Sequence, residues 1–220
     1  LLLLVIDHKG RTIRQLQIDR DTMTTVNVLG MFGNSAGSRV MQICLSHGYG
    51  MDRQERCKNS IKAVEGLLNC PEIDLYMEIP LDAIASLNDL LGGVTVTLED
   101  DFTAADPAMR KGATLTLTGE QAITLVRRRM DVADGTNEAR MTRQREFMDA
   151  AVPLIRDKID ESSGFVTTMI DTLSPYLTTN MARGRMINEI NRSYHYEVEP
   201  VQYLSGEYSI GEDRFMEFHA

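Results

Sequence analysis

The sequence predicts a single α/β domain with helices on both sides of a β-sheet. Segments with strand-like apolar or β-branched patterns alternate with helical segments along the whole chain. The 220 residues, of which 43% are hydrophobic and 25% charged, suffice for one sizeable core and are ordinary for a globular protein. No internal repeat or low-complexity tract indicates another architecture.

The chain opens with a predicted β-hairpin. Residues 1–6 (LLLLVI) form a continuous apolar run, as expected for a strand covered on both faces. Residues 12–18 (TIRQLQI) alternate apolar and polar side chains and predict a second strand. The HKG turn at residues 8–10 would join the two strands.

The middle of the chain predicts a flexible loop, a helix, a strand, a short helix and a strand. Glycines mark the loop, apolar residues at helical spacing mark the first helix, and the β-branched VTVTL marks the last strand. Cys70-Pro71 would end the first helix and Gly92-Gly93 the second. In order, the ranges are 31–39, 53–68, 73–79, 81–91 and 94–98.

The rest of the chain predicts further helices and a strand. Thr118 and Gln121 have the spacing of a capping box, so a helix should start there and run to about Arg128. A long helix is expected over residues 138–161, with a buried stripe of Met148, Ala151, Val152, Ile155 and Ile159. Two helices, near residues 165–173 and 181–190, and a strand at 196–203 complete the prediction.

Charge and hydropathy exclude two function classes. The 32 acidic residues outnumber the 23 basic ones, which argues against nucleic-acid binding. The longest apolar run is far shorter than the roughly 20 residues of a membrane-spanning helix, and it lacks the flanks of a signal peptide. Because the chain opens directly on this run, we expect any membrane anchor to precede residue 1.

The cysteines leave the redox compartment undecided. Cys44, Cys57 and Cys70 form no CxxC pair, which argues against a zinc site. A Cys44–Cys57 disulfide and buried free thiols both fit this spacing. His47, in the glycine-flanked LSHGYG turn, is expected to be a hydrogen-bonding spacer.

Six of the 18 arginines lie within residues 125–147 (LVRRRMDVADGTNEARMTRQREF). A helix ending near residue 128 would turn Arg127 and Arg129 toward one point, while Arg128 faces solvent. Arg140, Arg143 and Gln144 share one face at the start of the next helix, whose N-terminus also attracts anions. Guanidinium groups are planar forks suited to phosphate, so we expect this cluster to hold a pyrophosphate. The alternative is a solvated charged surface with acidic counterions.

Two further polar segments have alternative interpretations. Arg20, in Asp19-Arg20-Asp21-Thr22, follows a predicted strand and would point into the rim of the sheet, where α/β proteins tend to keep ligands. The alternative, which this short motif alone favours, is a surface arginine paired with a flanking aspartate. The carboxylates of residues 99–101 could bind a divalent cation, but a charged loop is the commoner arrangement.

Taken together, the motifs resemble those of the LytR-CpsA-Psr (LCP) phosphotransferases of bacterial cell-envelope assembly. The resemblance covers roughly residues 1–154 and rests on the order of the motifs rather than on any single one. They are RDT at 20–22, HGYG at 47–50, GGV at 92–94, TGEQA at 118–122, VRRR at 126–129 and RMTRQ at 140–144.

The resemblance implies a fold, an activity and a location. The fold would be a mixed β-sheet sandwiched between helical layers, forming one LCP-like catalytic domain over residues 1–220. The activity would be transfer of an anionic glycopolymer from a polyprenyl-pyrophosphate carrier to peptidoglycan through a phosphodiester, with Mg²⁺ as cofactor and pyrophosphatase as a side activity. The enzyme would be anchored upstream in the bacterial membrane and would act on its extracytoplasmic face.

The resemblance also implies site residues. Arg20, Arg127 and Arg129 would be catalytic. Together with Arg140, Arg143 and Gln144 they would bind and polarise the pyrophosphate. Residues near Leu125, Met148 and Val152 would line an apolar cavity for the lipid, and we expect Asp21 to fix an arginine rather than to orient the acceptor hydroxyl.

Three departures keep a second function class open. Asp19 stands where the family usually has proline, and residues 42–46 lack a lysine that commonly precedes the glycine-tyrosine turn. The acidic residues that hold magnesium in the family lie about where this chain begins or before it, so no metal ligand is assigned. The alternative is a non-catalytic sensor or regulator domain that binds a polyprenyl phosphate or a polyanion.

Overall fold

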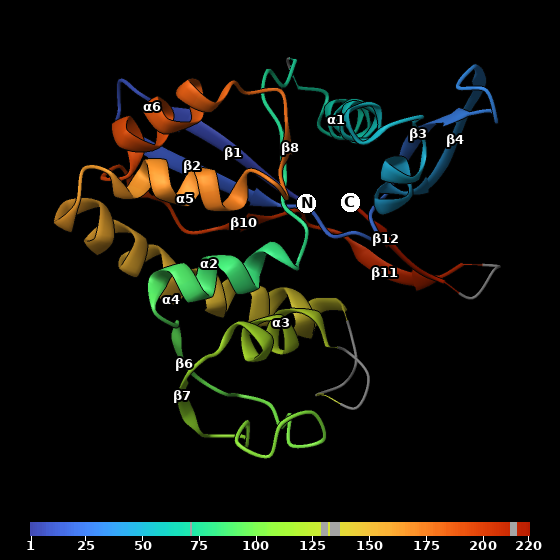
Figure 1. Ribbon diagram of the computed structural model, residues 1–220. Coiled ribbons are helices and arrows are strands. Elements are labelled where there is room, and N and C mark those ends of the chain that lie inside the picture. The colour runs from blue at the N-terminus through green and yellow to red at the C-terminus, as the bar shows by residue number, and fades with distance from the viewer. Residues whose placement is uncertain (71, 129–131, 133–136, 212–214) are drawn as a thin grey trace. The chain divides into compact units, whose positions relative to one another are not determined.

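A computed structural model describes residues 1–70, 72–128, 132, 137–211 and 215–220. The chain divides into two compact units (Figure 1). Unit 1 contains Leu1–Glu78, Thr178–Ala182 and His195–Ala220, and unit 2 contains Ile79–Leu177 and Arg183–Tyr194. The predicted α/β class is confirmed, because both strands and helices build the chain.

Unit 1 is organised around a mixed sheet. Strand β1 (Leu2–Asp7) pairs antiparallel with β2 (Thr12–Gln17), which confirms the predicted hairpin. Asp7 closes the turn by accepting hydrogen bonds from the backbone N–H groups of Lys9 and Gly10, both at 2.9 Å. Two short strands, β9 (Glu197–Val198) and β10 (Gln202–Tyr203), pair parallel with β2. They replace the single strand predicted at residues 196–203.

The expectation that the first strand is covered on both faces is wrong. Strand β1 pairs only with β2 among the described strands, so it lies at an edge of the sheet. Leu2, Leu4 and Val5 are each about half exposed, and only Leu3 is partly buried. An uninterrupted apolar run therefore does not by itself show which faces of a strand are buried.

The loop predicted over residues 31–39 is a second error, because most of this segment is strand. Strand β3 (Met23–Leu29) pairs antiparallel with β4 (Ser35–Gln42), with a register irregularity between Asn27 and Leu29. The connection closes with hydrogen bonds from Gly30 N to Asn34 O at 2.8 Å and from Gly33 N to Gly30 O at 3.0 Å. Gly33 has φ +73°, a conformation that glycine adopts without strain. The glycine-rich composition concealed a hairpin.

The 3₁₀ helix η1 (Ile43–Gly48) and helix α1 (Arg53–Leu68) follow this hairpin and pack against β3. The side chain of Asp52 caps α1 by accepting from Glu55 N at 2.8 Å. Helix α1 ends at Leu68, as predicted, and its C-cap Asn69 is in the left-handed conformation. The buried core of this region consists of Ile18, Val26, Ile43, Ala63 and Val64.

Unit 1 also contains two smaller pairs of strands. Strand β5 (Met77–Glu78) pairs with β8 (Thr178–Thr179), so only two residues of the strand predicted at 73–79 are in a ladder. Strands β11 (Glu207–Ile210) and β12 (Met216–His219) form an antiparallel pair that the sequence analysis did not predict.

Unit 2 is mainly helical. Its elements in chain order are α2 (Ala83–Leu91), β6 (Thr95–Thr97), β7 (Thr114–Thr116), α3 (Gly119–Arg127), α4 (Asn137–Glu161), α5 (Phe165–Leu173) and α6 (Arg183–Ser193). Helix α2 packs against α3, α4 and α5, and α3 packs against α4. All the helices predicted in this part of the chain are present.

Local chemistry explains several helix ends in unit 2. The predicted capping box is confirmed: Gln121 N donates to Thr118 Oγ1 at 3.3 Å, and Thr118 N donates to Gln121 Oε1 at 3.0 Å. Gly92 ends α2 in the left-handed conformation at φ +84°. In α4 the predicted stripe is buried at Ala151 and Ile159, but Met148 is exposed.

Among the described helices, none combines the length and apolar character that crossing a bilayer requires. The prediction of one domain spanning residues 1–220 stays a prediction.

Candidate functional site

The C-terminal end of α3 is held by side chains of α4. Arg143 lies in the second turn of α4 and donates from Nε to Leu125 O at 3.2 Å and from an Nη atom to Arg128 O at 2.6 Å. Gln144 donates from Nε2 to Val126 O at 3.0 Å. The last carbonyl groups of a helix have no partners within the helix. Arg143 and Gln144 supply those partners and fix the backbone of residues 125–128.

Arg143 is a buried cation in a polar network. Only 3% of its side chain is exposed, and its second Nη atom pairs with Asp100 Oδ2 at 2.9 Å. Its guanidinium carbon lies 5.7 Å from the centre of the Phe102 ring. Burying a charge is costly unless it is paired and hydrogen-bonded, and here each of the three nitrogen atoms has a protein partner.

This arrangement differs from the one expected from the sequence. Arg143 and Gln144 were expected to point at a ligand, but both bond to protein carbonyls. The structure therefore gives them a positioning role at the end of α3. Direct contact between these two side chains and a pyrophosphate stays a prediction.

The neighbouring arginines are more exposed. Arg127 has 67% of its side chain exposed and lies 3.8 Å from Asp82 in an ion pair between exposed groups. Arg128 is half-buried, contrary to the expectation that it faces solvent. Arg140, in the first turn of α4, donates to Asn137 Oδ1 at 2.5 Å. Arg129 lies outside the described residues.

Arg20 lies in a tight turn of unit 1 that Asp19 organises. Asp19 is 7% exposed, although it occupies the place of the family's proline. Its Oδ1 atom accepts from Asp21 N at 2.8 Å, and its Oδ2 atom accepts from the Tyr208 hydroxyl at 2.7 Å. Its carbonyl accepts from the Thr22 hydroxyl at 2.8 Å. An aspartate bonded to the backbone two residues later is a recognised turn former.

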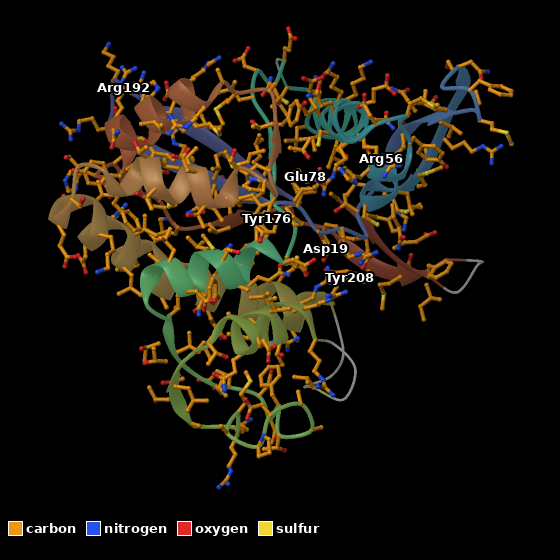
Figure 2. All side chains as sticks on the ribbon, in the orientation of Figure 1. Asp19, Arg56, Glu78, Tyr176, Arg192 and Tyr208 are labelled. Carbon is orange, nitrogen blue, oxygen red and sulfur yellow. The ribbon has the colours of Figure 1, made fainter. Side chains whose placement is uncertain are left out.

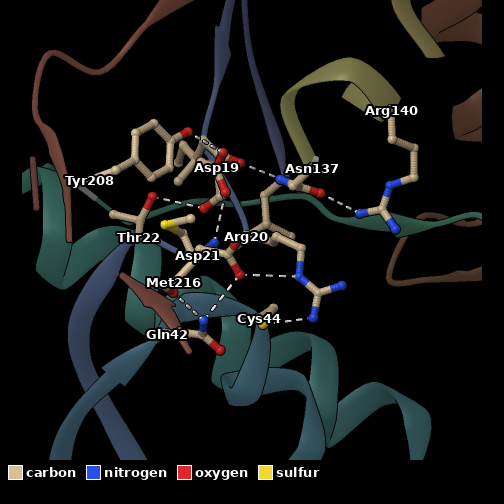
Figure 3. Close-up of polar contacts among 12 residues, drawn as sticks. Asp19, Arg20, Asp21, Thr22, Gln42, Cys44, Asn137, Arg140, Tyr208 and Met216 are labelled. Carbon is tan, nitrogen blue, oxygen red and sulfur yellow. Dashed lines mark hydrogen bonds and ion pairs between the residues drawn. The ribbon is translucent and has the colours of Figure 1, made fainter. Parts of the chain in front are cut away.

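Arg20 contacts Asp21 in its own turn and Cys44 in η1 (Figure 3). Its Nε atom lies 3.4 Å from Asp21 Oδ1, which bears out the expectation that Asp21 fixes an arginine. Its Nη2 atom donates to Cys44 Sγ at 3.5 Å. Gln42, in the segment where a lysine was expected, donates to the same Asp21 oxygen at 3.1 Å. About 40% of the Arg20 side chain stays exposed.

The motif arginines thus form two groups, each within its own unit. The α3–α4 junction brings together Arg143, Gln144 and the backbone that carries Arg127. The Asp19–Thr22 turn presents Arg20 within unit 1. Convergence of Arg20, Arg127, Arg129, Arg140 and Arg143 on one anion stays a prediction.

Two open alternatives from the sequence have structural answers. The acidic segment at residues 99–101 is a charged loop, since Asp100 pairs with Arg143 and Asp101 accepts from the Thr103 hydroxyl at 2.5 Å. Burial first, and then the charges of Glu99 and Asp100, raise the pKa of Glu146.

Cys44, Cys57 and Cys70 are all free thiols, so the Cys44–Cys57 disulfide is absent.

The residues that support the arginines were not predicted in that role from the sequence. Asp19 was expected as a departure from the family and as one of two possible partners of Arg20, and Asp100 was considered as a cation ligand. Tyr208 lies about 190 residues from its partner in the chain, and no local pattern links the two. A buried arginine needs an acidic partner. The acidic residues 99–101, which follow the predicted strand at 94–98, were the one signal in the sequence that pointed to Asp100 as that partner.

Comparison with known proteins gives consistent results. The chain is 28% identical over 152 residues to the polyisoprenyl-teichoic acid–peptidoglycan teichoic acid transferase TagU of Bacillus mycoides, covering 69% of this chain and 45% of the relative. It is 26% identical over 191 residues to TagU of Bacillus anthracis, covering 86% of this chain and 56% of the relative. The chain therefore spans about half the length of these curated relatives.

The fold is also shared with solved structures. Protein gbs0355 of Streptococcus agalactiae superposes with a TM-score of 0.79 at 21% identity, covering 99% of this chain and 72% of that protein. TagV of B. subtilis gives a TM-score of 0.70 at 20% identity, covering 99% and 81%. Residues 1–212 match the LytR_cpsA_psr family over nearly the whole sequence. The chain belongs to the LytR_cpsA_psr family.

Proposed function

We propose that this chain is the catalytic part of a phosphotransferase that moves an anionic glycopolymer from a polyprenyl-pyrophosphate carrier to peptidoglycan. Membership of the LytR_cpsA_psr family supports the proposal. So do the relatives named polyisoprenyl-teichoic acid–peptidoglycan teichoic acid transferase.

The fixed end of α3 is the observation that carries the proposal. Arg143 and Gln144 bond the carbonyls of Leu125, Val126 and Arg128, which leaves little freedom to the backbone around Arg127. Donors that are already oriented stabilise developing charge without reorganising during the reaction. A chain that needed only surface charge for solubility would not require a buried arginine to hold this segment.

The chemistry is a displacement at phosphorus. A sugar hydroxyl of peptidoglycan attacks the phosphorus that carries the glycopolymer, and a new P–O bond forms. The P–O bond to the polyprenyl phosphate breaks, the lipid leaves as its monophosphate, and the hydroxyl proton passes to solvent. Arg20 and Arg127, with Arg129 and Arg140, would stabilise the charge on the transferring phosphoryl oxygens. Water in place of the sugar hydroxyl would give the pyrophosphatase side activity.

Magnesium is part of this proposal only through the family resemblance. In the described part of the chain, the one group of three or more possible metal ligands includes a thiol and an imidazole. Mg²⁺ prefers oxygen ligands, so this group does not suit it. Asp19 and Asp21 are engaged with the turn and with Arg20. No residue of this chain is assigned to magnesium.

The location and the lipid site are also proposed from the family resemblance. A glycopolymer transferase that uses peptidoglycan would act on the extracytoplasmic face of a bacterial membrane, held there by an anchor outside this chain. The polyprenyl tail would need an apolar cavity. Leu125 is buried and Val152 half-buried, whereas Met148 is exposed, so Met148 is the weakest of the three expected lining residues.

The test compares transfer with binding. The full-length protein, with Mg²⁺, is given a polyprenyl-pyrophosphate-linked anionic glycopolymer and peptidoglycan, and polymer transfer and carrier binding are both measured. Arg20→Lys keeps the charge but loses the planar fork. We expect transfer to slow by about 10²-fold, while carrier binding weakens much less. Arg185→Lys, at an exposed position in α6, is the matched control and should transfer normally.

Two results would count against the proposal. Tight carrier binding without any transfer by the unmodified protein would favour the non-catalytic binding domain. Equal losses of binding and transfer in Arg20→Lys would mean that Arg20 holds the ligand but gives no extra stabilisation to the transition state.

A further inference from the structure

Three side chains of unit 1 converge on one point. They are His47 from η1, Cys57 from the second turn of α1 and Glu78 from β5. The Cys57 Sγ atom lies 3.6 Å from Glu78 Oε2 and 3.9 Å from His47 Nε2. The remaining side of the triangle, from His47 Nε2 to Glu78 Oε2, is 3.7 Å. Cys57 Sγ, His47 Nε2 and Glu78 Oε2 therefore form a triangle in which each atom lies close to the other two.

This triangle has the size of one face of a tetrahedral metal site. Bonds of about 2.3 Å to sulfur and about 2.0–2.2 Å to nitrogen and oxygen place neighbouring ligand atoms roughly 3.3–3.7 Å apart. The three observed separations lie at or slightly above the upper end of that range. Hydrogen bonds that involve sulfur are also this long, and the Cys57 thiol donates to Glu78 Oε2 in the structure. The short separation between His47 and Glu78 brings all three atoms together.

The burial of the ligands suits a bound ion. Cys57 is buried, whereas His47 and Glu78 are partly exposed, so an ion could enter from solvent. Glu78 presents Oε2 to the cluster, and its Oε1 atom lies 3.8 Å from Arg53 Nη2, which orients the carboxylate from outside. Residues that contact a metal ligand from outside, as Arg53 contacts Glu78, commonly fix the orientation of that ligand. Figure 2 labels Glu78 among the side chains of its unit.

Metal binding would also change the charge of the cluster. A divalent ion would offset the two negative charges of a thiolate and a carboxylate, and its binding would release the thiol proton.

We propose that His47, Cys57 and Glu78 bind a divalent transition-metal ion of zinc type, with three protein ligands and a fourth position open. The mixed sulfur, nitrogen and oxygen set favours Zn²⁺ or Co²⁺ over Mg²⁺. Among the described residues it is the one cluster of this kind. This proposal does not depend on the proposed transferase function.

A bound ion would also link three elements of unit 1, namely η1, α1 and β5. Strand β5 has only two residues in its ladder, and η1 is a single short 3₁₀ helix. Cys44, the partner of Arg20, lies in the same η1 helix. Metal binding should therefore stabilise unit 1 and restrain the helix next to the Asp19–Thr22 turn.

Cobalt provides the direct test. The reduced, metal-free protein is titrated with Co²⁺ and then with Zn²⁺, and the absorption spectrum and the binding heat are measured. We expect a 1:1 complex with thiolate-to-cobalt charge transfer and tetrahedral ligand-field bands, displaced by Zn²⁺ but not by excess Mg²⁺. Titration in two buffers with different ionisation heats should reveal release of about one proton.

Matched variants assign the ligands. Cys57→Ser, His47→Gln and Glu78→Gln should each weaken Co²⁺ binding by about 10²-fold or more, because loss of a direct ligand exceeds the 10–100-fold effect of an outer partner. Cys70→Ser removes another free thiol and should leave the spectrum unchanged. Absence of a Co²⁺ complex in the unmodified protein would overturn the proposal. So would a thiolate band that survives Cys57→Ser, or six-coordinate bands without thiolate. Glu78→Gln keeps the shape of the side chain, so it separates loss of a ligand from misfolding.

Discussion

The α3–α4 junction and the Asp19–Thr22 turn use their arginines in opposite ways. At the junction, Arg143 is buried, and all three of its nitrogen atoms bond to protein groups. In the turn, Asp21 and Cys44 hold Arg20, which keeps about 40% of its side chain exposed. In the described part of the chain, the buried Nε atom of Arg20 makes an ion pair but no hydrogen bond.

The difference shows that arginines of the same set of motifs have two roles, one structural and one suited to anion binding. A fully buried guanidinium must have partners in the protein, so it fixes structure. A partly exposed guanidinium held by one carboxylate keeps donors available for an anion. Arg143 therefore supports the site, whereas Arg20 and Arg127 are the side chains suited to meet a phosphate.

The largest expected effect follows from removing the buried arginine. Arg143→Ala should lower the free energy of unfolding by about 3–5 kcal/mol, because it leaves Asp100 and two helix-end carbonyls without their donor. Urea denaturation measures this loss. Arg143→Lys restores the charge without the fork and should recover only part of it.

Arg127→Ala is the matched control for stability. Its ion pair with Asp82 joins two exposed side chains, and such pairs contribute little. The free energy of unfolding should change by less than about 0.5 kcal/mol. A loss as large as that of Arg143→Ala would erase the distinction between the two kinds of arginine.

A smaller effect is expected in the turn that holds Arg20. Asp19→Ala removes the acceptors of Asp21 N and of the Tyr208 hydroxyl, and should cost about 1–3 kcal/mol. Asp19→Asn keeps one side-chain oxygen acceptor and should cost less. Urea denaturation of both variants checks the order, and equal stability of all three proteins would show that Asp19 does not organise the turn.

The smallest effect concerns Glu146 and depends on pH. Its raised pKa means that the native state binds this proton more tightly than the unfolded chain does. The resulting stabilisation is present below the unfolded pKa and is lost as the pH rises through the folded pKa. At neutral pH the charged Glu146 therefore opposes folding. Glu146→Gln should raise Tm by about 1–3 °C at pH 7, and the difference should shrink in acid. A constant difference at all pH values would exclude this cause.

Much of the fold could be predicted from local patterns. The Thr118–Gln121 capping box, the α2 terminator at Gly92 and the first hairpin are set by neighbouring residues, and all three are confirmed. The β3–β4 hairpin was missed because its glycines resemble a loop, although the partner strand supplies the pairing. Strands β11 and β12 were missed entirely.

The site was predictable only in part. The motif order located the arginines, but burial separates their roles, and burial depends on contacts between distant residues such as Arg143 with Asp100. The His47–Cys57–Glu78 cluster shows the same limit. Its ligands come from three elements, with no short spacing of the CxxC kind, so the sequence argued against zinc at a place where the geometry favours it.

Transfer and stability measured on the same preparations of Arg127→Gln test the central claim most directly. The claim is that Arg143 holds the end of α3 so that Arg127 can act on the phosphoryl group. Glycopolymer transfer should fall by about 10²-fold or more, while the free energy of unfolding stays within about 0.5 kcal/mol of the unmodified protein. Transfer at the unmodified rate would contradict the account, because Arg127 would then be a solvated surface charge.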